Sequence, residues 1–258
     1  MSNILNTNCD DAEVVFTMDE NSHPHCVWID GGFVKYSCHH GSEWRLAGNS
    51  SVAVSSSDTL LLSKNCMGFN AQGNCFFSYK DGEDLKTASW NGASWTIEKI
   101  TDETTVGSIL AWSACWSGFS VVMAIVENAG VKSLVEFDNS TGSWVSSGSV
   151  AIPAQDNSVV ELKTAKVANW IYAFWNGEDV NSGMGWIGHA SWDFNSSTWF
   201  YLPNKQIQMS LDEYEIMDLD FVVTDELLSS SSSSSESSLS SYLGGIGYMA
   251  IGTGFVVA

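Results

Sequence analysis

Hydrophobic and polar residues alternate with a period of two through most of the chain, in short runs separated by glycine-rich turns. The clearest example is Leu85–Lys99, LKTASWNGASWTIEK, where two alternating runs flank an Asn-Gly pair. Because Asn-Gly readily takes the positive φ angles of a tight hairpin, this stretch predicts two antiparallel strands, the second opened by Trp95. No segment before residue 205 keeps a helical period, so the pattern predicts an all-β chain.

The same hairpin recurs along the chain. Further copies are FVKYSCHHGSEWRL from Phe33, VKSLVEFDNSTGSWV from Val131 and GHASWDFNSSTWFYL from Gly188. The tryptophans that open the last strand of each copy are separated by 51, 49 and 55 residues, and they are Trp44, Trp95, Trp144 and Trp199. A period near 50 residues built from strands is typical of β-propellers, in which four-stranded antiparallel blades repeat around an axis.

Each repeat divides into four expected strands, of which the first would be innermost and the tryptophan-led strand outermost. The expected strands of the first repeat are Val14–Met18, His25–Ile29, Phe33–Cys38 and one from Trp44, and those of the second are Met67–Asn70, Cys75–Tyr79, Leu85–Trp90 and Trp95–Ile100. Those of the third repeat are Ile109–Ala114, Phe119–Val126, Val131–Phe137 and Trp144–Val150, and those of the fourth are Leu162–Ala168, Trp170–Trp175, Trp186–Trp192 and Trp199–Leu202. The blades would occupy residues 14–65, 66–107, 108–161 and 162–212.

A fifth, irregular blade is expected from residue 213, within a propeller domain of residues 1–228. Residues 229–241 are almost pure serine, which predicts a solvated linker. Residues 242–258 are uncharged and glycine-rich. This tail completes the fifth blade, docks on another subunit as an assembly anchor, or forms a membrane tail; blade completion is the favoured interpretation. A five-bladed propeller is therefore preferred over a four-bladed one.

The composition limits the classes of partner that the chain is expected to bind. The formal net charge is −20, with ten basic and thirty acidic residues, which argues against binding to nucleic acid or anionic membranes. The six cysteines form no CxxC motif, and the first residues lack a basic, apolar signal peptide. We therefore expect synthesis in the cytoplasm with free thiols, followed by release into a virion or extracellular assembly.

The repeats resemble those of many bacterial and phage β-propellers. HPHCVWIDGGFVKYSCHHGSEW and GNCFFSYKDGEDLKTASWNGASWTIEKI carry the loose pattern of an aromatic residue with Asp, then LKYA, a D/N-G turn and W-x-x-E. The resemblance covers about residues 14–202 and weakens in the third and fourth repeats. The turn DNSTGSW from Asp138 also resembles the Asp-box turn of sialidase-like propellers, but without its Ser/Thr-x-Asp spacing. The serine run resembles linkers of virion appendage proteins. These resemblances imply a propeller and do not specify a function.

The loops after each second strand carry the strongest candidates for ligand binding. They place an aromatic or apolar residue beside a carboxylate, which suits a sugar because a ring packs on the pyranose and the acid accepts hydroxyl protons. The alternative is that the ring fills the blade core and the acid caps a turn. The candidate residues are Trp28, Asp30, Tyr79, Asp81, Glu127, Trp175 and Glu178. The enlarged fourth-repeat loop, Gly177–Gly185, is the favoured place for specific recognition.

Other chemistry is weakly indicated. His25 should face Cys38 across the Gly31-Gly32 hairpin, near His23, His39, His40 and Cys26, but the spacing matches no metal-site pattern. We therefore expect neither a metal nor a cofactor, and no catalytic residue. The chain is expected to be a non-enzymatic recognition or structural module of a virion appendage or surface assembly, binding a glycan or a protein. The alternatives are a propeller glycosidase or lyase, whose paired carboxylates would converge at the axis, and a purely structural decoration protein.

Overall fold

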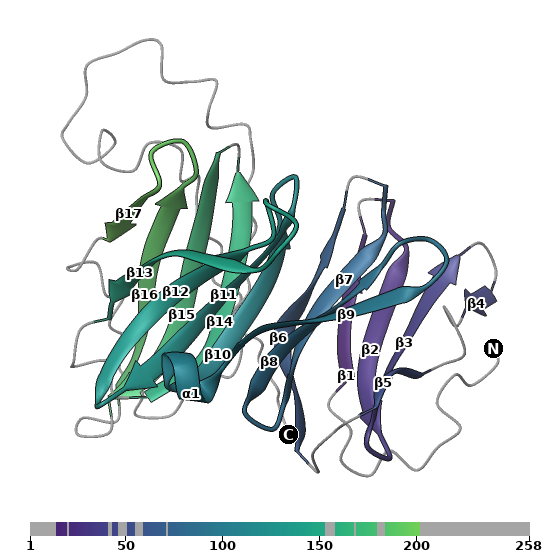
Figure 1. Cartoon of the computed structure of the whole chain (residues 1–258), viewed down its shortest axis with the longest axis horizontal. Coiled ribbons are helices and arrows are strands. Elements are labelled where there is room, and N and C mark those ends of the chain that lie inside the picture. Colours follow the sequence, from purple (N-terminus) through teal and green to yellow (C-terminus); the bar gives the residue numbers. More distant parts are fainter. Residues whose placement is uncertain are drawn as a thin grey trace. The chain divides into compact units, whose positions relative to one another are not determined.

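The computed structural model describes residues 14–19, 21–40, 43–45, 51–54, 59–70, 72–152, 158–167, 169–179 and 184–201. The expected fifth blade, the serine linker and the tail lie outside these residues. The chain divides into two compact units, Met1–Ala154 and Gln155–Ala258. Antiparallel strands make up nearly all of the described parts of both units (Figure 1).

The described residues of the first unit form three antiparallel sheets, each made of strands that follow one another along the chain. In every sheet the first and last strands of the repeat lie at opposite edges. The first sheet consists of β1 (Val14–Met18), β2 (Pro24–Asp30), β3 (Phe33–His40) and β4 (Glu43–Arg45), and β5 (Ser51–Val54) also pairs with β3. The second sheet consists of β6 (Leu60–Phe69), β7 (Cys75–Asp81), β8 (Asp84–Trp90) and β9 (Trp95–Asp102). The third sheet consists of β10 (Ser108–Trp116), β11 (Ser120–Asn128), β12 (Val131–Asp138) and β13 (Val145–Ala151).

The second unit contains one four-stranded antiparallel sheet among its described residues. Its strands are β14 (Ser158–Val167), β15 (Trp170–Asp179), β16 (Met184–Asp193) and β17 (Thr198–Tyr201). The prediction of an almost all-β architecture with one antiparallel sheet for each repeat is thus confirmed for the described residues, with four strands in three of the sheets and five in the first. Each of the sixteen expected strands has an observed counterpart, and the tryptophan-led strand is an edge strand in each sheet.

Two elements were not predicted. Strand β5 adds to the first sheet, and the helix α1 (Glu103–Val106) follows β9 directly. The helix begins because the Asp102 side chain caps it, accepting a hydrogen bond from the backbone N–H of Thr105 at 2.8 Å. It has four residues, which is too few to show a helical period in the sequence.

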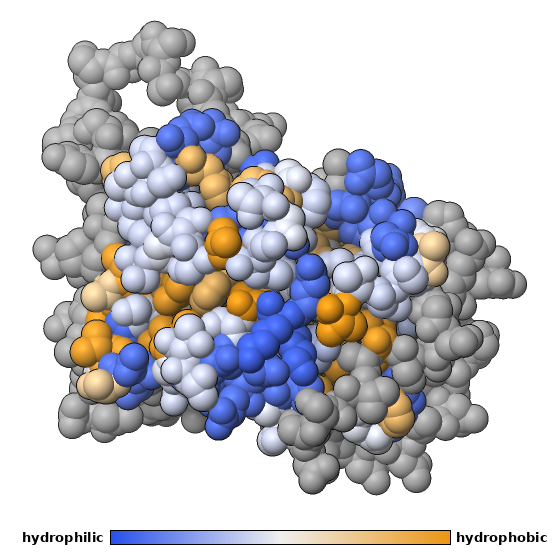
Figure 2. Space-filling view, viewed as in Figure 1, coloured by the Kyte–Doolittle hydropathy of each residue, from blue (hydrophilic) through white to orange (hydrophobic). Residues whose placement is uncertain are grey.

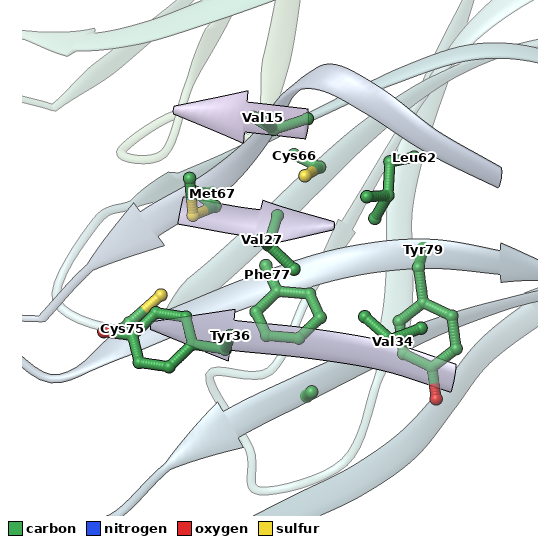
Figure 3. Packing of buried hydrophobic residues seen from close by; sticks show 11 residues of the cluster. Val15, Val27, Val34, Tyr36, Leu62, Cys66, Met67, Cys75, Phe77 and Tyr79 are labelled. Atoms are coloured by element: carbon green, nitrogen blue, oxygen red, sulfur yellow. The ribbon is translucent and has the colours of Figure 1, made fainter. Parts of the chain in front are cut away.

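The three sheets of the first unit pack through their faces. One core lies between the first and second sheets, where Val27 and Tyr36 meet Phe77 and Tyr79 (Figure 3). A second core joins the second and third sheets through residues such as Phe76 and Phe137. Strand β7 is buried on both sides, since Phe77 contributes to one core and Phe76 to the other. Strand β6 lies against both β1 and β10, so the first strands of the three sheets are neighbours, as they are in propeller blades.

Side chains of the tryptophan-led strands tie consecutive sheets together. The Trp95 ring packs against Tyr36 of the preceding sheet, with ring centroids 5.0 Å apart in a T-shaped arrangement. The Trp144 indole N–H donates to Glu98 Oε2 of the preceding sheet at 3.3 Å, and the Asn139 side chain donates to the same oxygen at 3.2 Å. The W-x-x-E motif of the second repeat, Trp95 to Glu98, therefore contacts both neighbouring sheets.

Candidate functional site

The acid at the end of the second strand is paired with a lysine of its own hairpin in the first sheet. Asp30 ends β2, and the Lys35 ammonium group forms an ion pair with its Oδ2 atom. Both side chains are partly accessible, at 22% for Lys35 and 29% for Asp30. In the strand register Lys35 lies opposite Trp28, so the lysine stem stands beside the ring that precedes the acid.

The second sheet repeats this arrangement in a less accessible form. Lys86 Nζ lies 2.7 Å from Asp81 Oδ2, and the Asp81 side chain is only 2% exposed. Lys86 is also 3.6 Å from Asp84, which in turn pairs with Lys99 at 2.8 Å. Lys99 then contacts Asp102 at 2.6 Å. These pairs form a continuous network of alternating charge, and a hydrophilic patch covers this region over β8 and β9 (Figure 2).

The spacing between acid and lysine is the same in three repeats. Asp30 and Lys35, Asp81 and Lys86, and Glu127 and Lys132 are each five positions apart. In the third sheet Glu127 and Lys132 stand directly opposite each other in the register of β11 and β12. The fourth repeat differs, because the residue five positions after Glu178 is Gly183. Glu178 lies in β15, and its side chain is outside the described residues.

The three candidate aromatic rings are interior. Trp28 is 4% exposed, Tyr79 is 2% exposed and Trp175 is fully buried. This corrects the expectation of exposed aromatic plates, because a ring enclosed on both faces has no surface on which a sugar could pack. The alternative from the sequence, that the ring fills the interior and the acid belongs to a turn, agrees with these positions. Tyr79 belongs to the core between the first two sheets.

Trp175 owes its burial to a glycine on the neighbouring strand. Trp175 and Gly188 are register partners in β15 and β16. A Cβ atom added to Gly188 would lie 2.2 Å from the Trp175 ring, so any larger residue would displace the indole. The same arrangement occurs in the second sheet, where the Phe76 ring occupies the space above Gly68. An aromatic residue lying over a cross-strand glycine is therefore a packing device of this chain.

The described contacts do not bring the candidate acids of the first unit together. Asp30, Asp81 and Glu127 lie in three different sheets, and the first two have a lysine partner in their own hairpins. Trp175 and Glu178 belong to the second unit. Paired carboxylates facing each other over a cleft, which glycoside hydrolysis requires, are not seen among these described residues.

The histidine-rich hairpin has a structural arrangement. His25 and Cys38 are register partners, as predicted from the Gly31-Gly32 turn. The Asp19 side chain accepts hydrogen bonds from the backbone N–H groups of Asn21 and His23, and lies 3.1 Å from His23 Nδ1. Burial opposes ionisation of Asp19, but these hydrogen bonds outweigh it and keep its pKa below the usual value.

His25 completes this arrangement inside the first sheet. Its Nδ1 atom is 2.5 Å from the Tyr36 hydroxyl and its Nε2 atom is 3.6 Å from Asp19. Burial lowers the pKa of His25 despite the attraction of Asp19, so the ring is neutral near pH 7. Within the described parts of the chain, no group of three or more His, Cys, Asp or Glu side chains is arranged to hold a metal ion.

One buried acid was missed by the sequence reasoning. Glu136 on β12 is fully buried, and neither of its carboxylate oxygens has a hydrogen-bond partner. Burial raises the pKa of Glu136 to about 7, and the nearby charge of Asp138 acts in the same direction. The available signal was the run LVEFD, in which an acid stands at a position of the third strand whose neighbours are apolar.

Comparison with known proteins gives only distant likenesses. No protein-family profile matches the chain, and no curated protein does so. Among solved structures, the α-L-arabinofuranosidase CtGH43 from Clostridium thermocellum has 8% identity and a TM-score of 0.45, over 70% of this chain and 69% of its own. TolB from Acinetobacter baumannii has 9% identity and a TM-score of 0.44, over 74% of this chain and 43% of its own. The GH43 endo-arabinanase from Bacillus licheniformis has 11% identity and a TM-score of 0.42, over 72% of this chain and 75% of its own. Likenesses this low transfer no activity.

None of the helices in the described residues has the length and apolar character needed to span a bilayer.

Proposed function

We propose that this chain is a non-enzymatic recognition module of a surface assembly, and that it binds a glycan through the β15–β16 hairpin of its fourth repeat. The observation that carries the proposal is the difference between the repeats. Asp30 and Asp81 are engaged by lysines of their own hairpins, whereas Glu178 occupies the related position with no lysine five residues later. We infer that, without a lysine at this spacing, the Glu178 carboxylate accepts hydrogen bonds from sugar hydroxyl groups.

The first three sheets then serve as the scaffold. One hydrophobic core joins the first and second sheets and another joins the second and third, and the acids Asp30 and Asp81 are paired with lysines of their own hairpins. Functional residues in repeat proteins commonly lie where one repeat departs from its siblings, because the regular positions are occupied by packing. The fourth repeat departs by its longer loop and its missing lysine.

The repeats also indicate how the whole chain is arranged. We propose a closed propeller of five blades, the last formed by residues from 213 onwards, including the 242–258 tail. Residues 203–258 are about as long as one further repeat. The segment Met217–Val223, MDLDFVV, supplies a strand-like alternation for its first strand. Anchoring of the tail to another subunit, on a virion or a similar assembly, is the alternative arrangement.

A glycan array tests the binding proposal. The wild-type chain should bind a defined set of glycans, and Glu178→Gln should abolish that binding while leaving the circular dichroism spectrum and unfolding midpoint unchanged. Asp30→Asn is the matched control, since it changes the related acid in a lysine-paired hairpin, and it should bind as the wild type does. Loss of binding in both variants, or in neither, would contradict the assignment to Glu178.

The same experiment separates the enzyme alternative. Bound oligosaccharides should be recovered intact after prolonged incubation, as judged by mass spectrometry. Release of shorter sugars by the wild-type chain, abolished in an acid-to-amide variant, would replace the recognition module with a glycosidase or lyase. Electron microscopy of a purified assembly tests the architecture, because five blades around one axis would be visible directly.

A further inference from the structure

The third sheet contains a carboxyl group in surroundings that do not suit its charge. Glu136 lies on β12 opposite Met123 of β11 and Gly148 of β13, so neither cross-strand neighbour offers a hydrogen-bond donor from its side chain. Its side chain is fully buried, and both carboxylate oxygens are without a hydrogen-bond partner. A charged carboxylate in such a place would cost several kcal/mol, whereas the neutral acid costs far less.

Asp138 is the second acid of the site and lies two residues along the same strand, on the same face of the sheet. Its carboxylate accepts hydrogen bonds from the Ser140 backbone N–H at 2.9 Å and from the Ser147 hydroxyl at 2.5 Å. Burial opposes its ionisation, but these donors lower its pKa below the usual value, so Asp138 keeps its charge.

A β-bulge explains why the two acids are treated differently. The register of β12 and β13 passes from Glu136 opposite Gly148 to Phe137 opposite Ser146, which leaves Ser147 as the additional residue. The bulge directs the Ser147 hydroxyl to Asp138, and the hydrogen-bonding influence of Ser147 on Glu136 lowers the pKa of that acid by less than burial and the charge of Asp138 raise it. Two carboxyl groups that are close together have different pKa values when hydrogen-bond donors outweigh burial at one and burial outweighs the donors at the other.

We propose that Glu136 is protonated in the folded chain in mildly acidic solution, and that its ionisation as the pH rises through neutrality destabilises the sheet β10–β13. Among the described residues, Asp138 is the ionisable group whose charge acts on Glu136. No described positive charge acts on Glu136 to favour its ionised form. The third sheet thus carries a built-in proton sensor.

The direction of the pH effect follows from linkage. In the unfolded chain a glutamate ionises near its usual pKa of about 4.3, whereas folded Glu136 holds its proton to about 7. The stabilisation is fully present below the unfolded value and is lost as the pH rises through the folded value. The loss corresponds to a change on the order of 100-fold in the folding equilibrium constant.

Infrared difference spectroscopy tests the protonation state directly. The wild-type spectrum minus that of Glu136→Gln, at about pH 6, should contain the C=O band of a protonated carboxylic acid, shifted in D2O. The band should disappear as the pH is raised to about 8.5. Absence of the band at about pH 6 would overturn the proposal, because Glu136 would then be ionised in the folded chain. This readout does not depend on a stability measurement.

Denaturant unfolding from about pH 4.5 to about pH 8.5 tests the consequence, because the stability should fall between the unfolded and the folded pKa of Glu136. Glu136→Gln imitates the neutral acid and should flatten the pH dependence, unfolding at higher denaturant than the wild type in alkaline solution. Glu127→Gln, a partly exposed acid on β11 of the same sheet, should keep the wild-type dependence. Equal pH dependence in the wild type and Glu136→Gln would overturn the proposal. So would a stabilisation by added Ca²⁺ that Glu136→Gln abolishes, since the pair would then be neutralised by a cation.

Discussion

The hairpins of the second and fourth sheets differ in how they use the same positions. In the second, Asp81 is enclosed and held by Lys86, within a network that reaches Lys99. In the fourth, a glycine stands where the lysine would be, and Trp175 is accommodated by Gly188 rather than covered by a lysine stem. The comparison shows that hairpins with a similar sequence pattern are stabilised in two ways. One uses an ion pair between an acid and a lysine, and the other packs an aromatic ring over a glycine of the neighbouring strand.

The largest effect should come from the fourth sheet. Trp175→Ala removes a fully buried indole whose volume the neighbouring Gly188 cannot fill, and should lower the free energy of unfolding by about 3–5 kcal/mol. Phe200→Ala in the same sheet is the control, because that ring is 47% exposed, and it should cost much less. Urea unfolding followed by circular dichroism checks both. Equal losses in the two variants would mean that the sheet does not rely on the buried ring.

The ion pairs of the first and second sheets should differ in strength. Lys86→Met removes the lysine that pairs with the Asp81 carboxylate, which is 2% exposed, and should lower the free energy of unfolding by roughly 2–4 kcal/mol at pH 7. Lys35→Met disrupts the more accessible pair with Asp30 and should cost less than about 1 kcal/mol. Thermal and urea unfolding of both variants measure the difference. If the two substitutions cost the same, burial is not what distinguishes the hairpins.

The contact between the second and third sheets should have an intermediate effect. Glu98→Ala removes the acceptor shared by Trp144 and Asn139 and should cost about 1–2 kcal/mol. A double-mutant cycle with Trp144→Phe isolates the indole hydrogen bond, and the two losses should be less than additive. Strict additivity would show that the bond between the sheets contributes nothing.

The smallest effect is expected at the surface end of the charge network. Lys99 pairs with Asp84 and Asp102 but is 47% exposed, so water screens both pairs. Lys99→Ala should leave the unfolding midpoint unchanged within error, at low and at high salt. A clear loss of stability that salt removes would show that the whole network acts as a unit.

Much of the fold could be predicted because alternation and turns are local signals. The strands were placed by period and by pairs such as Gly31-Gly32, whose hairpin register fixed His25 opposite Cys38. Strand β6 begins at Leu60 rather than at the predicted Met67, because an irregularity between Leu62 and Met67 interrupts the alternation. Because a bulge breaks the two-residue alternation, the part of a strand that lies before it is not predicted from the sequence pattern.

The site was less predictable because exposure depends on neighbours distant in sequence. Trp28 and Tyr79 stand beside carboxylates, as a sugar site would require, yet the local pattern is the same for a ring that is buried. The lysines that pair with the hairpin acids belong to the LKYA-like motif and can be seen in the sequence. Their pairing with the acids, however, depends on the hairpin register rather than on the motif. The run LVEFD is only a weak signal for the burial of Glu136, since an acid within a strand usually marks an exposed face.

The contacts of Trp95 and Glu98 give the stack of sheets in the first unit a direction. Trp95 packs on the preceding sheet, while Glu98 accepts from the following one, so the two faces of that sheet are complementary rather than alike. Such a head-to-tail interface leaves one unmatched face at each end of the stack, unless a ring closes or a cap intervenes. A fragment containing only the first three repeats would therefore be expected to associate with further copies of itself, head to tail.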